Sequence, residues 1–538
     1  MNFTRLTILH LALLMAVGAT AQRTAAQKFA SIQAAPTQSL HYTISMESPS
    51  SHKFHVVLQC EGLNTPSLDL KMPAWMPGYY QLLDYAKNLS DFHATDNTGH
   101  ELAWAKTTNN TWRVEHPTGS PLTITYDILA QKAFVAQPWL DNTHAYIAPT
   151  GIFLYIDGQL QLPVTIEVKP AQGWSKIATG LAPVKGQLHV QGQSHGTGTS
   201  PRNTFYAPDF DILYDCPFLV GPLEDIPSFT VRGIPHYFTG YNMGEFDKQQ
   251  LSSDLEKVIA QGVVVIGDIP YKDYTFLAIG NGPGGIEHLN SATIGFSGPS
   301  MKTPEGRQRM LCFIAHEYFH HYNVKRIRPL ALGPFDYQQA NKTDQLWVSE
   351  GLTVYYEYML VRRAGLMSGE DLLHHFQSDI VAYEKHSGHL YQTLAQASED
   401  TWSEGPFGGN PDSSISYYQK GPAIGLLLDF AIRHHTANKR SLDDAMRTMY
   451  QQYYQQKKRG FTGPEFRKVC ETIAGADLTE IFDYVYTTKE PDYAKYLAYG
   501  GLGIDLETST DGKPNFRMYP LQQVDVLQAS IRKDWLKE

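Results

Sequence analysis

The sequence predicts an α+β protein of more than one domain, in which an all-β sandwich precedes a mixed sheet and a helical bundle. Three observations lead to this prediction. The 538 residues exceed what one ordinary core contains. Short strand-like runs fill residues 40–224, and helical periodicity dominates after residue 303. With 42% hydrophobic and 18% charged residues, the composition is that of a globular chain with sizeable cores.

The first 21 residues are predicted to be a secretory signal peptide. Arg5 precedes an apolar run from about Leu6 to Val17, and Ala19–Ala21 gives a small-residue cleavage pattern. The run is shorter than the roughly 20 residues that a membrane span needs, and no cysteine follows for lipid attachment. Residues 22–39 are small and polar, which indicates a flexible leader. We therefore expect a secreted or periplasmic protein with no transmembrane segment beyond the signal peptide.

Period-two alternation predicts the β-sandwich over residues 40–224. Runs such as KFHVVLQC, PLTITYDILA and VTIEVKP alternate apolar and polar side chains, and Gly, Pro, Asn and Asp separate them. The four cysteines are too few and too scattered for a disulfide framework. A single bridge between Cys60 and Cys216 stays open as an alternative.

Residues 225–497 are predicted to form the mixed sheet and the helical bundle. YTFLAIGNGPGGIEHLNSATIGFS is typical of a strand, a glycine-rich turn and a second strand. Helical periodicity covers roughly residues 304–322, 347–365, 369–385, 418–435, 441–457 and 463–473. The remaining residues 498–538 are too few for another independent domain.

The charge balance limits the partners that we expect. A formal charge of −10 and a pI near 6.1 argue against a surface dedicated to nucleic acid or to an anionic membrane. We therefore expect no nucleic-acid partner. The sequence does not indicate an oligomeric state.

The stretch AHEYFHHYNVKRIRP, residues 315–329, carries the strongest chemical signal. Thr303–Glu305 supplies an N-cap, a proline at the first helical position and an acid in the first turn, so a helix begins there. His316 and His320 are four residues apart, lie on one face and can bind one ion together. Glu317 is offset by about 100 degrees and can reach the attacking water without being a ligand. Two neutral imidazoles suit Zn²⁺, although a helix with two solvated histidines gives the same pattern.

Catalytic zinc needs a third protein ligand and an open position. The downstream candidates are Asp336, Asp344, Glu350 and Glu357. We favour Glu350, because it begins an aromatic-rich helix in which a buried acid needs a partner. The two aspartates lie in a polar loop, and Glu357 lies two turns further along its helix. We therefore expect one Zn²⁺ per chain, held by His316, His320 and Glu350.

The other polar residues of this stretch have weaker assignments. His321 points about 100 degrees away from His320 and is expected either beside the ligands or at the surface. Lys325, Arg326 and Arg328 follow the helix directly. Favourable charges at a helix C-terminus and a contact with a substrate carboxylate are equal alternatives for these cations.

Four separated motifs give the chain a resemblance to a known family. GGIEHLNS, HEYFHHYNVKRIRP, LWVSEGLTVYY and ISYYQKG occur in this order, and the chain resembles the glycyl aminopeptidase family of gluzincin zinc metallopeptidases. The upstream MPAWMPGYYQLLDYAKNLSDFHA is similar to the N-terminal β-domain of that family. The resemblance covers about residues 40–498 and implies a thermolysin-like catalytic domain over 225–497. Family members often carry a C-terminal PDZ domain, which the short segment 498–538 predicts to be absent or a remnant.

The resemblance also implies roles for single residues. His316, His320 and Glu350 match the zinc ligands, and Glu317 matches the general base. Tyr418 matches the position that donates a hydrogen bond to the developing oxyanion, which favours the transition state over the bound substrate. Its neighbour Tyr417 is an alternative for that role.

GNGPGGIEH matches the strand that pairs with the substrate backbone in related gluzincin aminopeptidases. Gly284 and Gly285 allow the close approach of a peptide, and Glu287 resembles the acid that holds the free N-terminal ammonium. A glycine-rich turn with an exposed acid is the alternative interpretation of this segment.

Together these assignments predict an exported zinc aminopeptidase that removes small N-terminal residues, Gly or Ala, from peptide substrates. A zinc metallo-endopeptidase is the first alternative, and it needs no ammonium anchor. A non-catalytic exported binding protein with a structural zinc site is the second. The presence of Glu317 speaks against the second alternative, because a structural zinc site needs no base.

Overall fold

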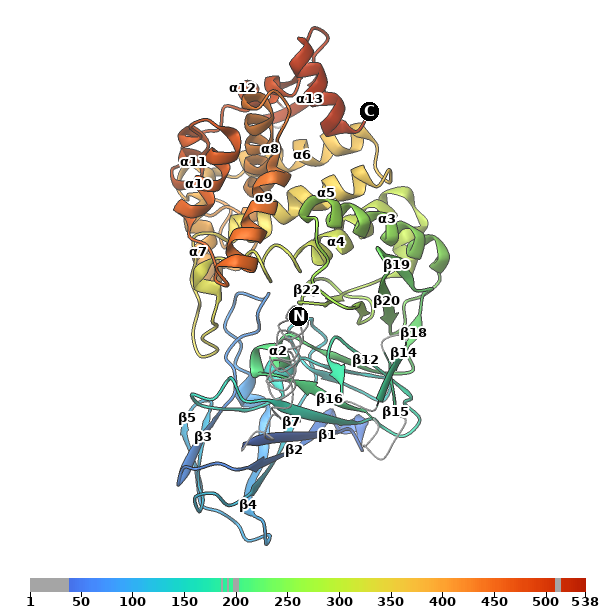
Figure 1. Cartoon of the computed structure of the whole chain (residues 1–538), viewed down its shortest axis with the longest axis vertical. Helices are drawn as coiled ribbons and strands as arrows, with labels where there is room; N and C mark the ends of the chain where they lie inside the picture. Colours follow the sequence, from blue (N-terminus) through green and yellow to red (C-terminus); the bar gives the residue numbers. More distant parts are fainter. Residues whose placement is uncertain (1–37, 185–186, 191–192, 197–202, 509–513) are drawn as a thin grey trace, which may run out of the picture.

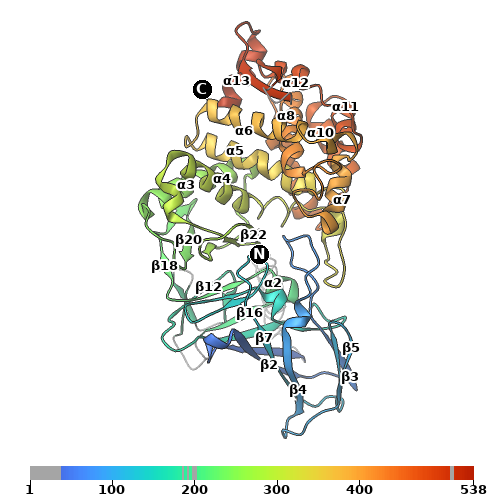
Figure 2. The same cartoon turned by 180° about the vertical axis from the view of Figure 1, so that it is seen from behind.

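The computed structural model describes residues 38–184, 187–190, 193–196, 203–508 and 514–538. The predicted signal peptide and nearly all of the predicted leader lie outside these residues. Figures 1 and 2 show a β-rich half, a helical half and a mixed sheet between them. This confirms the predicted fold class, with a β-rich N-terminal domain before a sheet and a helical region.

The β-rich domain contains a sandwich of two sheets. The larger sheet has the order β13-β16-β11-β1-β2-β7-β4. Its strands are β1 Ser39–Ser45, β2 Lys53–Glu61, β4 Leu89–Asp96, β7 Leu122–Leu129, β11 Val164–Lys169, β13 Ala182–Pro183 and β16 Thr204–Ala207. The smaller sheet contains β3 Ser67–Lys71, β5 Trp104–Thr108, β6 Thr111–Glu115 and β10 Tyr155–Ile156. Alternate residues of β2 are buried, so the predicted period of two produces one core between the sheets.

A third sheet departs from the simple sandwich that the sequence predicts. It contains β8 Trp139–Leu140, β9 Ala145–Ile147, β12 Lys176–Thr179 and β17 Phe218–Gly221. The domain also contains the short helix α2 Phe210–Tyr214 and the hairpin β14 Gln187–Val190 with β15 Gln193–Gly196. An apolar cluster joins the third sheet to the catalytic half and includes Met76, Tyr146, Leu219, Leu277 and Ile286. The two domains therefore share a packed interface.

The mixed sheet places one short strand at its edge. Its strands are β18 Glu224–Asp225, β19 Phe229–Val231, β20 Ile234–Gly240, β21 Tyr274–Ala278, β22 Gly285–Glu287 and β23 Ser291–Ile294. The order is β18-β20-β21-β23-β22, and β19 pairs with β20. Strands β20, β21 and β23 are parallel, whereas β22 pairs antiparallel with β23. Among the described strands, β22 has a neighbour on one side only, so its other side is free to pair with an extended peptide.

The helical half follows the predicted segments closely. Its main helices are α3 Lys248–Ile266, α4 Pro304–Phe319, α5 Leu352–Arg363, α6 Gly369–Glu384, α7 Leu394–Glu404, α8 Tyr417–His435, α9 Leu442–Met449, α10 Gly463–Ala474, α11 Thr479–Tyr486 and α12 Tyr493–Tyr499. Two π-helical turns, η6 Trp347–Gly351 and η8 Tyr450–Gln456, adjoin α5 and α9. Single 3₁₀ turns occur at Pro49–Ser51, Tyr85–Asn88, Pro149–Gly151, Gly298–Lys302, Leu330–Leu332 and Ser387–Leu390.

The C-terminal segment belongs to the core of the helical half. It forms the hairpin β24 Leu502–Thr508 with β25 Pro514–Pro520, followed by α13 Val526–Leu536. The buried ring of Trp535 packs against Phe430 at 5.1 Å and Phe376 at 5.6 Å, measured between ring centroids. The segment therefore stabilises the helical bundle directly.

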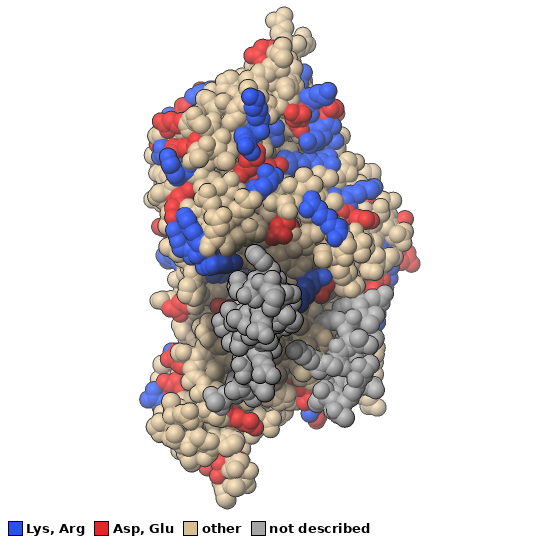
Figure 3. All heavy atoms as spheres, viewed as in Figure 1, with Lys and Arg blue, Asp and Glu red and all other residues tan. Residues whose placement is uncertain are grey.

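Two features of the described residues bear on the exported protein that the sequence predicts. All four cysteines are buried free thiols, so Cys60 and Cys216 form no bridge. No helix among the described residues combines the length and apolar character that a membrane crossing requires. On the face shown in Figure 3, basic and acidic side chains are mixed over the helical half.

A buried ion pair links the two domains. Asp215, just after α2, accepts a hydrogen bond from the Lys325 ammonium at 2.6 Å, and both side chains are buried. The Leu289 amide donates to the second Asp215 oxygen at 2.7 Å. Burial acts to raise the pKa of Asp215, but Lys325 and His288 outweigh it and hold this pKa below its usual value. The pair fixes the β-domain to the segment that follows Glu287.

The predicted basic cluster is therefore part of the domain interface. Lys325 is paired with Asp215, and Arg326 donates to the carbonyl oxygens of His321 and Leu289. The Arg328 side chain packs against Gly333, where an added Cβ would lie 2.1 Å from the guanidinium carbon. The Arg326 contact with His321, just after the end of α4, agrees with the expected charge at a helix C-terminus, whereas the Lys325 pair with Asp215 was not expected, because it depends on the β-domain.

We predict that Asp215→Asn destabilises the protein by about 3–5 kcal/mol, because it leaves the Lys325 charge buried without a counter-ion. Lys325→Met should cost a similar free energy of unfolding. The double variant Asp215→Asn/Lys325→Met should recover much of the loss, which denaturant unfolding measures directly. Strictly additive losses in the double variant would contradict the coupling of the two residues.

Candidate active site

Helix α4 presents two histidines on one face. The Thr303 hydroxyl accepts a hydrogen bond from the Gly306 amide at 3.0 Å, and Pro304 occupies the first turn, as the sequence predicts. The helix ends at Phe319, earlier than expected, but His320 keeps helical backbone angles of φ −58° and ψ −25°. The Nε2 atoms of His316 and His320 consequently lie 2.9 Å apart.

The outer nitrogen of each imidazole has its own acceptor. His316 Nδ1 contacts the Glu357 carboxylate at 2.8 Å, and His320 Nδ1 donates to the Asn323 carbonyl oxygen at 2.8 Å. These contacts hold the proton on Nδ1, so both Nε2 lone pairs face the centre of the cluster. Glu357, which the sequence offered as a rival ligand, instead orients His316.

Glu350 reaches the same point from a π-helical turn. Its Oε2 atom lies 3.1 Å from His320 Nε2 and 3.5 Å from His316 Nε2. Asn323, just after α4, donates from its amide to the carbonyl oxygens of Val348 at 2.7 Å and Ser349 at 3.2 Å. This side chain ties the turn η6 to the end of α4. No sequence pattern indicates that role, because it depends on the approach of two separate helices.

The cluster fits a zinc ion chemically. His316, His320 and Glu350 each offer one ligand atom, these atoms lie within 4.8 Å of one another, and all three residues are buried. Two imidazole nitrogens and one carboxylate oxygen form a donor set that Zn²⁺ prefers in catalytic sites. Burial acts to raise the pKa of Glu350, but His320 and His316 outweigh it and hold this pKa below its usual value. A positive charge is therefore favoured between the three side chains.

Glu317 is buried beside the cluster and against the edge strand. A Cβ added to Gly285 would lie 2.3 Å from the Glu317 Oε1 atom, so only glycine allows β22 to approach this closely. Burial raises the pKa of Glu317 to about 8, against which the imidazoles of His316 and His320 act. The carboxylates of Glu287 and Glu350 raise it further. Such a carboxyl group can hold a proton near neutral pH.

The structure separates the two candidate tyrosines by their hydroxyl partners. The Tyr418 hydroxyl donates to Glu350 Oε2 at 2.9 Å, whereas the Tyr417 hydroxyl pairs with the Thr401 hydroxyl at 3.1 Å. A glycine pair allows α8 to reach the cluster: a Cβ on Gly351 would lie 2.6 Å from the Gly421 Cα atom. The Tyr418 hydroxyl therefore contacts the cluster, whereas the Tyr417 hydroxyl is engaged by Thr401.

Glu287 ends the edge strand and is buried. Its side chain is 3% exposed, so the alternative of an exposed acid in a turn is wrong. Its Oε1 atom accepts no hydrogen bond from any described residue. Gly284 precedes it at a φ of +90°, which favours glycine. A buried carboxylate oxygen without a partner is costly unless a ligand supplies the missing donor.

His321 is the one histidine of the motif that lies away from the cluster. It is fully buried among the rings of Tyr271, Tyr274, Tyr318 and Tyr322. Burial lowers the pKa of His321 well below its usual value. The expected surface position is therefore wrong, and the imidazole packs in the core as a neutral ring.

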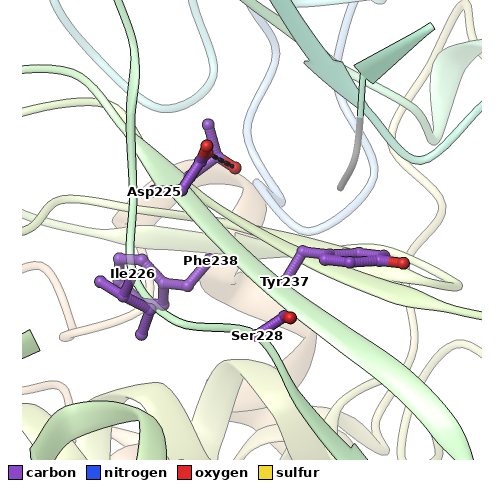
Figure 4. Close-up of a pocket in the computed structure, with 6 residues that line it drawn as sticks. Asp225, Ile226, Ser228, Tyr237 and Phe238 are labelled. Atoms are coloured by element: carbon purple, nitrogen blue, oxygen red, sulfur yellow. Dashed lines mark hydrogen bonds between the residues drawn. The ribbon is translucent and has the colours of Figure 1, made fainter. Parts of the chain in front are cut away.

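Two hollows in the described part of the chain contain none of the predicted site residues. The first is a shallow depression at the end of the mixed sheet, lined by Asp225, Ile226, Ser228, Tyr237, Phe238 and Thr239 (Figure 4). The second, of about 360 Å³, lies between the domains and includes Cys216, Leu289 and Arg326 in its lining. The concentration of buried ionisable groups around His316 instead makes this cluster the candidate functional site.

Family models match both halves of the chain. The model described as the Peptidase M61 N-terminal domain matches residues 41–222, and the model described as M61 glycyl aminopeptidase matches residues 309–424. The chain belongs to the M61 glycyl aminopeptidase family. As a member of this family it is a zinc metallopeptidase. The second match includes the cluster residues and Tyr418, whereas Glu287 lies outside both matches.

Solved structures support the same fold for this family member. An aminopeptidase N family protein from Idiomarina loihiensis is 26% identical, with a TM-score of 0.80 over 87% of this chain and 79% of that chain. An M1 zinc metallopeptidase from Deinococcus radiodurans is 15% identical, with a TM-score of 0.51 over 85% of this chain and 94% of that chain. The second likeness shows the fold alone. No curated protein matches the chain.

We predict that Glu357→Gln lowers the zinc affinity by about 10–100-fold, because the outer carboxylate fixes the orientation and basicity of His316. Competition with a chromogenic chelator measures this affinity. Asp344→Asn is the matched control, since Asp344 lies in the loop before η6 and is absent from the cluster. An unchanged affinity in Glu357→Gln would refute the proposed orientation of His316.

The metal-free protein should show a pH-dependent effect of Glu317→Gln. The folded-state pKa of Glu317 is about 8 against an ordinary value of 4.5. The unfolded chain therefore loses this proton first, and wild-type stability should fall as the pH rises between these two values. The glutamine variant lacks this loss and should be the more stable protein at pH 8, by a few kcal/mol.

Denaturant unfolding at pH 5 and pH 8, with zinc removed, tests this expectation. Glu305→Gln is the control, because Glu305 is exposed in the first turn of the same helix. An equal difference between wild type and Glu317→Gln at both pH values would show that Glu317 does not hold its proton in the folded state.

Proposed function

We propose that this protein is an exported zinc aminopeptidase that removes small first residues, Gly or Ala, from peptides. The observation that carries the proposal is the buried Oε1 atom of Glu287, to which no group in the described part of the chain donates a hydrogen bond, beside the His316–His320–Glu350 cluster. An endopeptidase has no use for a buried acid at the end of its substrate strand. An aminopeptidase needs one negative charge for the free amine of each substrate.

The edge strand β22 supports substrate binding in an extended form. A peptide that pairs with β22 satisfies the free backbone groups of this strand. Gly284 and Gly285 present no side chains, so the peptide backbone can approach closely. The N-terminal ammonium of the peptide then donates a hydrogen bond to Glu287. It also supplies the positive counter-charge for this buried carboxylate.

The chain's own residues account for the catalytic steps. His316, His320 and Glu350 would hold one Zn²⁺ per chain, which when bound activates a water molecule and polarises the scissile carbonyl group. Glu317 accepts a proton from the attacking water and delivers it to the nitrogen of the leaving amine. Tyr418 donates its phenol proton in a hydrogen bond to the carbonyl oxygen as negative charge develops there.

The N-terminal sequence supports export of the enzyme. Arg5, the apolar run Leu6–Val17 and the small residues Ala19–Ala21 form the parts of a cleavable signal peptide. We infer that the mature enzyme begins after about residue 21 and acts on peptides outside the cytoplasm. N-terminal sequencing of the secreted protein tests this inference.

The proposed activity predicts a clear difference between free and blocked peptides. Wild type should hydrolyse a glycyl chromogenic peptide and leave its N-acetyl-glycyl counterpart intact, because only the free amine can pair with Glu287. Glu317→Gln should lose about 10²–10⁴-fold in kcat, because the amide accepts no proton from water. Glu287→Ala should lose activity on the free peptide, mainly through a higher KM.

The outcomes separate the alternatives. Equal rates for wild type and Glu317→Gln would eliminate Glu317 as the base. Cleavage of the blocked peptide, with Glu287→Ala fully active on it, would support a metallo-endopeptidase. Stoichiometric zinc without hydrolysis of either peptide would support a non-catalytic binding protein.

A further inference from the structure

A loop of the β-domain enters the core of the catalytic half. This loop, residues 76–81, follows strand β3, and Tyr80 within it is only 6% exposed. Tyr80 and the preceding Trp75 belong to the hydrophobic core that the catalytic helices form. The β-domain therefore contributes side chains directly to the region of the active site.

Gly78 places the loop against Glu287. A Cβ added to Gly78 would lie 2.7 Å from the Glu287 Oε2 atom and 2.9 Å from the Ile286 Cγ2 atom. The φ of Gly78 is +94°, a conformation that glycine adopts without strain. Backbone of the loop consequently covers one side of the carboxylate that we propose for the substrate amine.

Tyr80 extends from the same loop towards the metal-ligand cluster. Burial raises the pKa of Tyr80 well above its usual value, and the nearby carboxylates of Glu350 and Glu287 raise it further. Tyr80 also interacts with the Tyr418 phenol. Tyr80 follows Gly78 by two residues and is buried in the catalytic core, so its phenol lies near both the Glu350 carboxylate and the proposed amine anchor, Glu287.

The covalent structure of a peptide substrate indicates which part of the substrate lies near these two carboxylates. The N-terminal amine binds Glu287, and the scissile carbonyl group lies at the His316–His320–Glu350 cluster. One Cα atom separates the amine from the carbonyl carbon, so the Cα atom lies between Glu287 and Glu350, and the first side chain starts from this point. A residue that borders both carboxylates therefore borders the first side chain of the substrate.

We propose that Tyr80 closes the subsite for the first substrate side chain and thereby restricts the enzyme to small N-terminal residues. The inference rests on the proposed aminopeptidase function and names the specificity-determining residue for it. A glycine or alanine leaves the Tyr80 phenol in place, whereas a leucine needs the volume that the phenol occupies.

The packing around Tyr80 makes this wall rigid. Its ring lies 6.2 Å from the Trp402 ring, which contacts the Trp75 ring at 5.0 Å, measured between centroids. The Trp75 indole donates to the Asp336 carbonyl oxygen at 2.8 Å, and the Ala74 amide donates to the Tyr337 carbonyl oxygen at 2.7 Å. Because these contacts cross the domain interface, the phenol cannot turn aside for a larger substrate without disturbing the core.

The adjacent Tyr79 offers a matched control. Its hydroxyl donates to the Gln81 side chain at 2.7 Å, and its ring packs on Phe134 at 5.1 Å. Burial raises the pKa of Tyr79 without a contribution from either carboxylate. Tyr79 thus shares the loop and the residue type of Tyr80 but not its place beside the two acids.

A graded series tests the proposal: Tyr80→Phe, Tyr80→Val and Tyr80→Ala, with Tyr79→Val as the control. The measured quantity is the kcat/KM ratio of leucyl to glycyl 4-nitroanilide for each zinc-loaded protein. Tyr80→Phe should keep the wild-type ratio, because the ring remains. Tyr80→Val and Tyr80→Ala should raise the ratio progressively, by about tenfold or more, and Tyr79→Val should leave it unchanged.

A binding measurement removes the dependence on turnover. In a Glu317→Gln background, calorimetry compares the affinities of Gly-Gly-Gly and Leu-Gly-Gly. The same Tyr80 substitutions should strengthen the binding of the leucyl peptide relative to the glycyl peptide. The Tyr80 substitutions could instead lower kcat/KM equally for both 4-nitroanilides and lower the affinity equally for both peptides, with unchanged ratios. That result would overturn the proposal and leave Tyr80 a structural residue.

A failure of the Tyr80 proposal can be distinguished from a failure of the proposed aminopeptidase function. If wild type does not hydrolyse glycyl substrates, the aminopeptidase assignment fails before Tyr80 is tested. If wild type prefers glycyl substrates and the ratio stays constant across the Tyr80 series, the function stands and the subsite assignment fails. Tyr80→Phe retains the buried ring and Tyr80→Val retains part of the apolar volume, so the comparison of these two variants with wild type holds even where Tyr80→Ala does not fold.

Discussion

The buried carboxylate of Glu350 is the point on which the catalytic half depends. A carboxylate in such a place is stable only where other groups offset its charge: Tyr418 donates a hydrogen bond to it, and a cation held jointly with His320 and His316 would neutralise it. The close contact between Gly351 and Gly421 allows α8, which carries Tyr418, to approach Glu350, because any side chain there would hold α8 away. The amide of Asn323 then fixes the turn that carries Glu350 to the end of α4.

The β-domain is part of the active site as well as a neighbour of it. The Asp215–Lys325 pair and the apolar cluster around Ile286 hold the edge strand β22 between the two domains. Gly78 covers one side of Glu287, and Trp75 packs in the catalytic core. The strand that we propose to receive the substrate is therefore positioned from both sides, and its geometry depends on the correct docking of two separately built cores.

Local sequence patterns predicted several strands and helices correctly and missed others. Alternation in β2 and capping at Thr303 are properties of neighbouring residues, so they predicted a strand and a helix start correctly. The β-domain includes strands of two residues, β8 in the third sheet and β10 in the smaller sheet of the sandwich, which are too short to show a period. Helices α7, α11 and α12 are short, and tertiary packing rather than periodicity stabilises them.

The sequence by itself determined the chemistry of the centre, because the spacing of His316 and His320 on one helix fixes two side chains relative to each other. Only the tertiary structure decided which distant groups join them. It placed the Tyr418 hydroxyl against Glu350 and the Tyr417 hydroxyl against Thr401. It also placed Glu357 beside His316, and Tyr80 of the β-domain in the catalytic core. These outcomes depend on how whole helices and domains pack, since the direction of a side chain in space follows from the placement of its element.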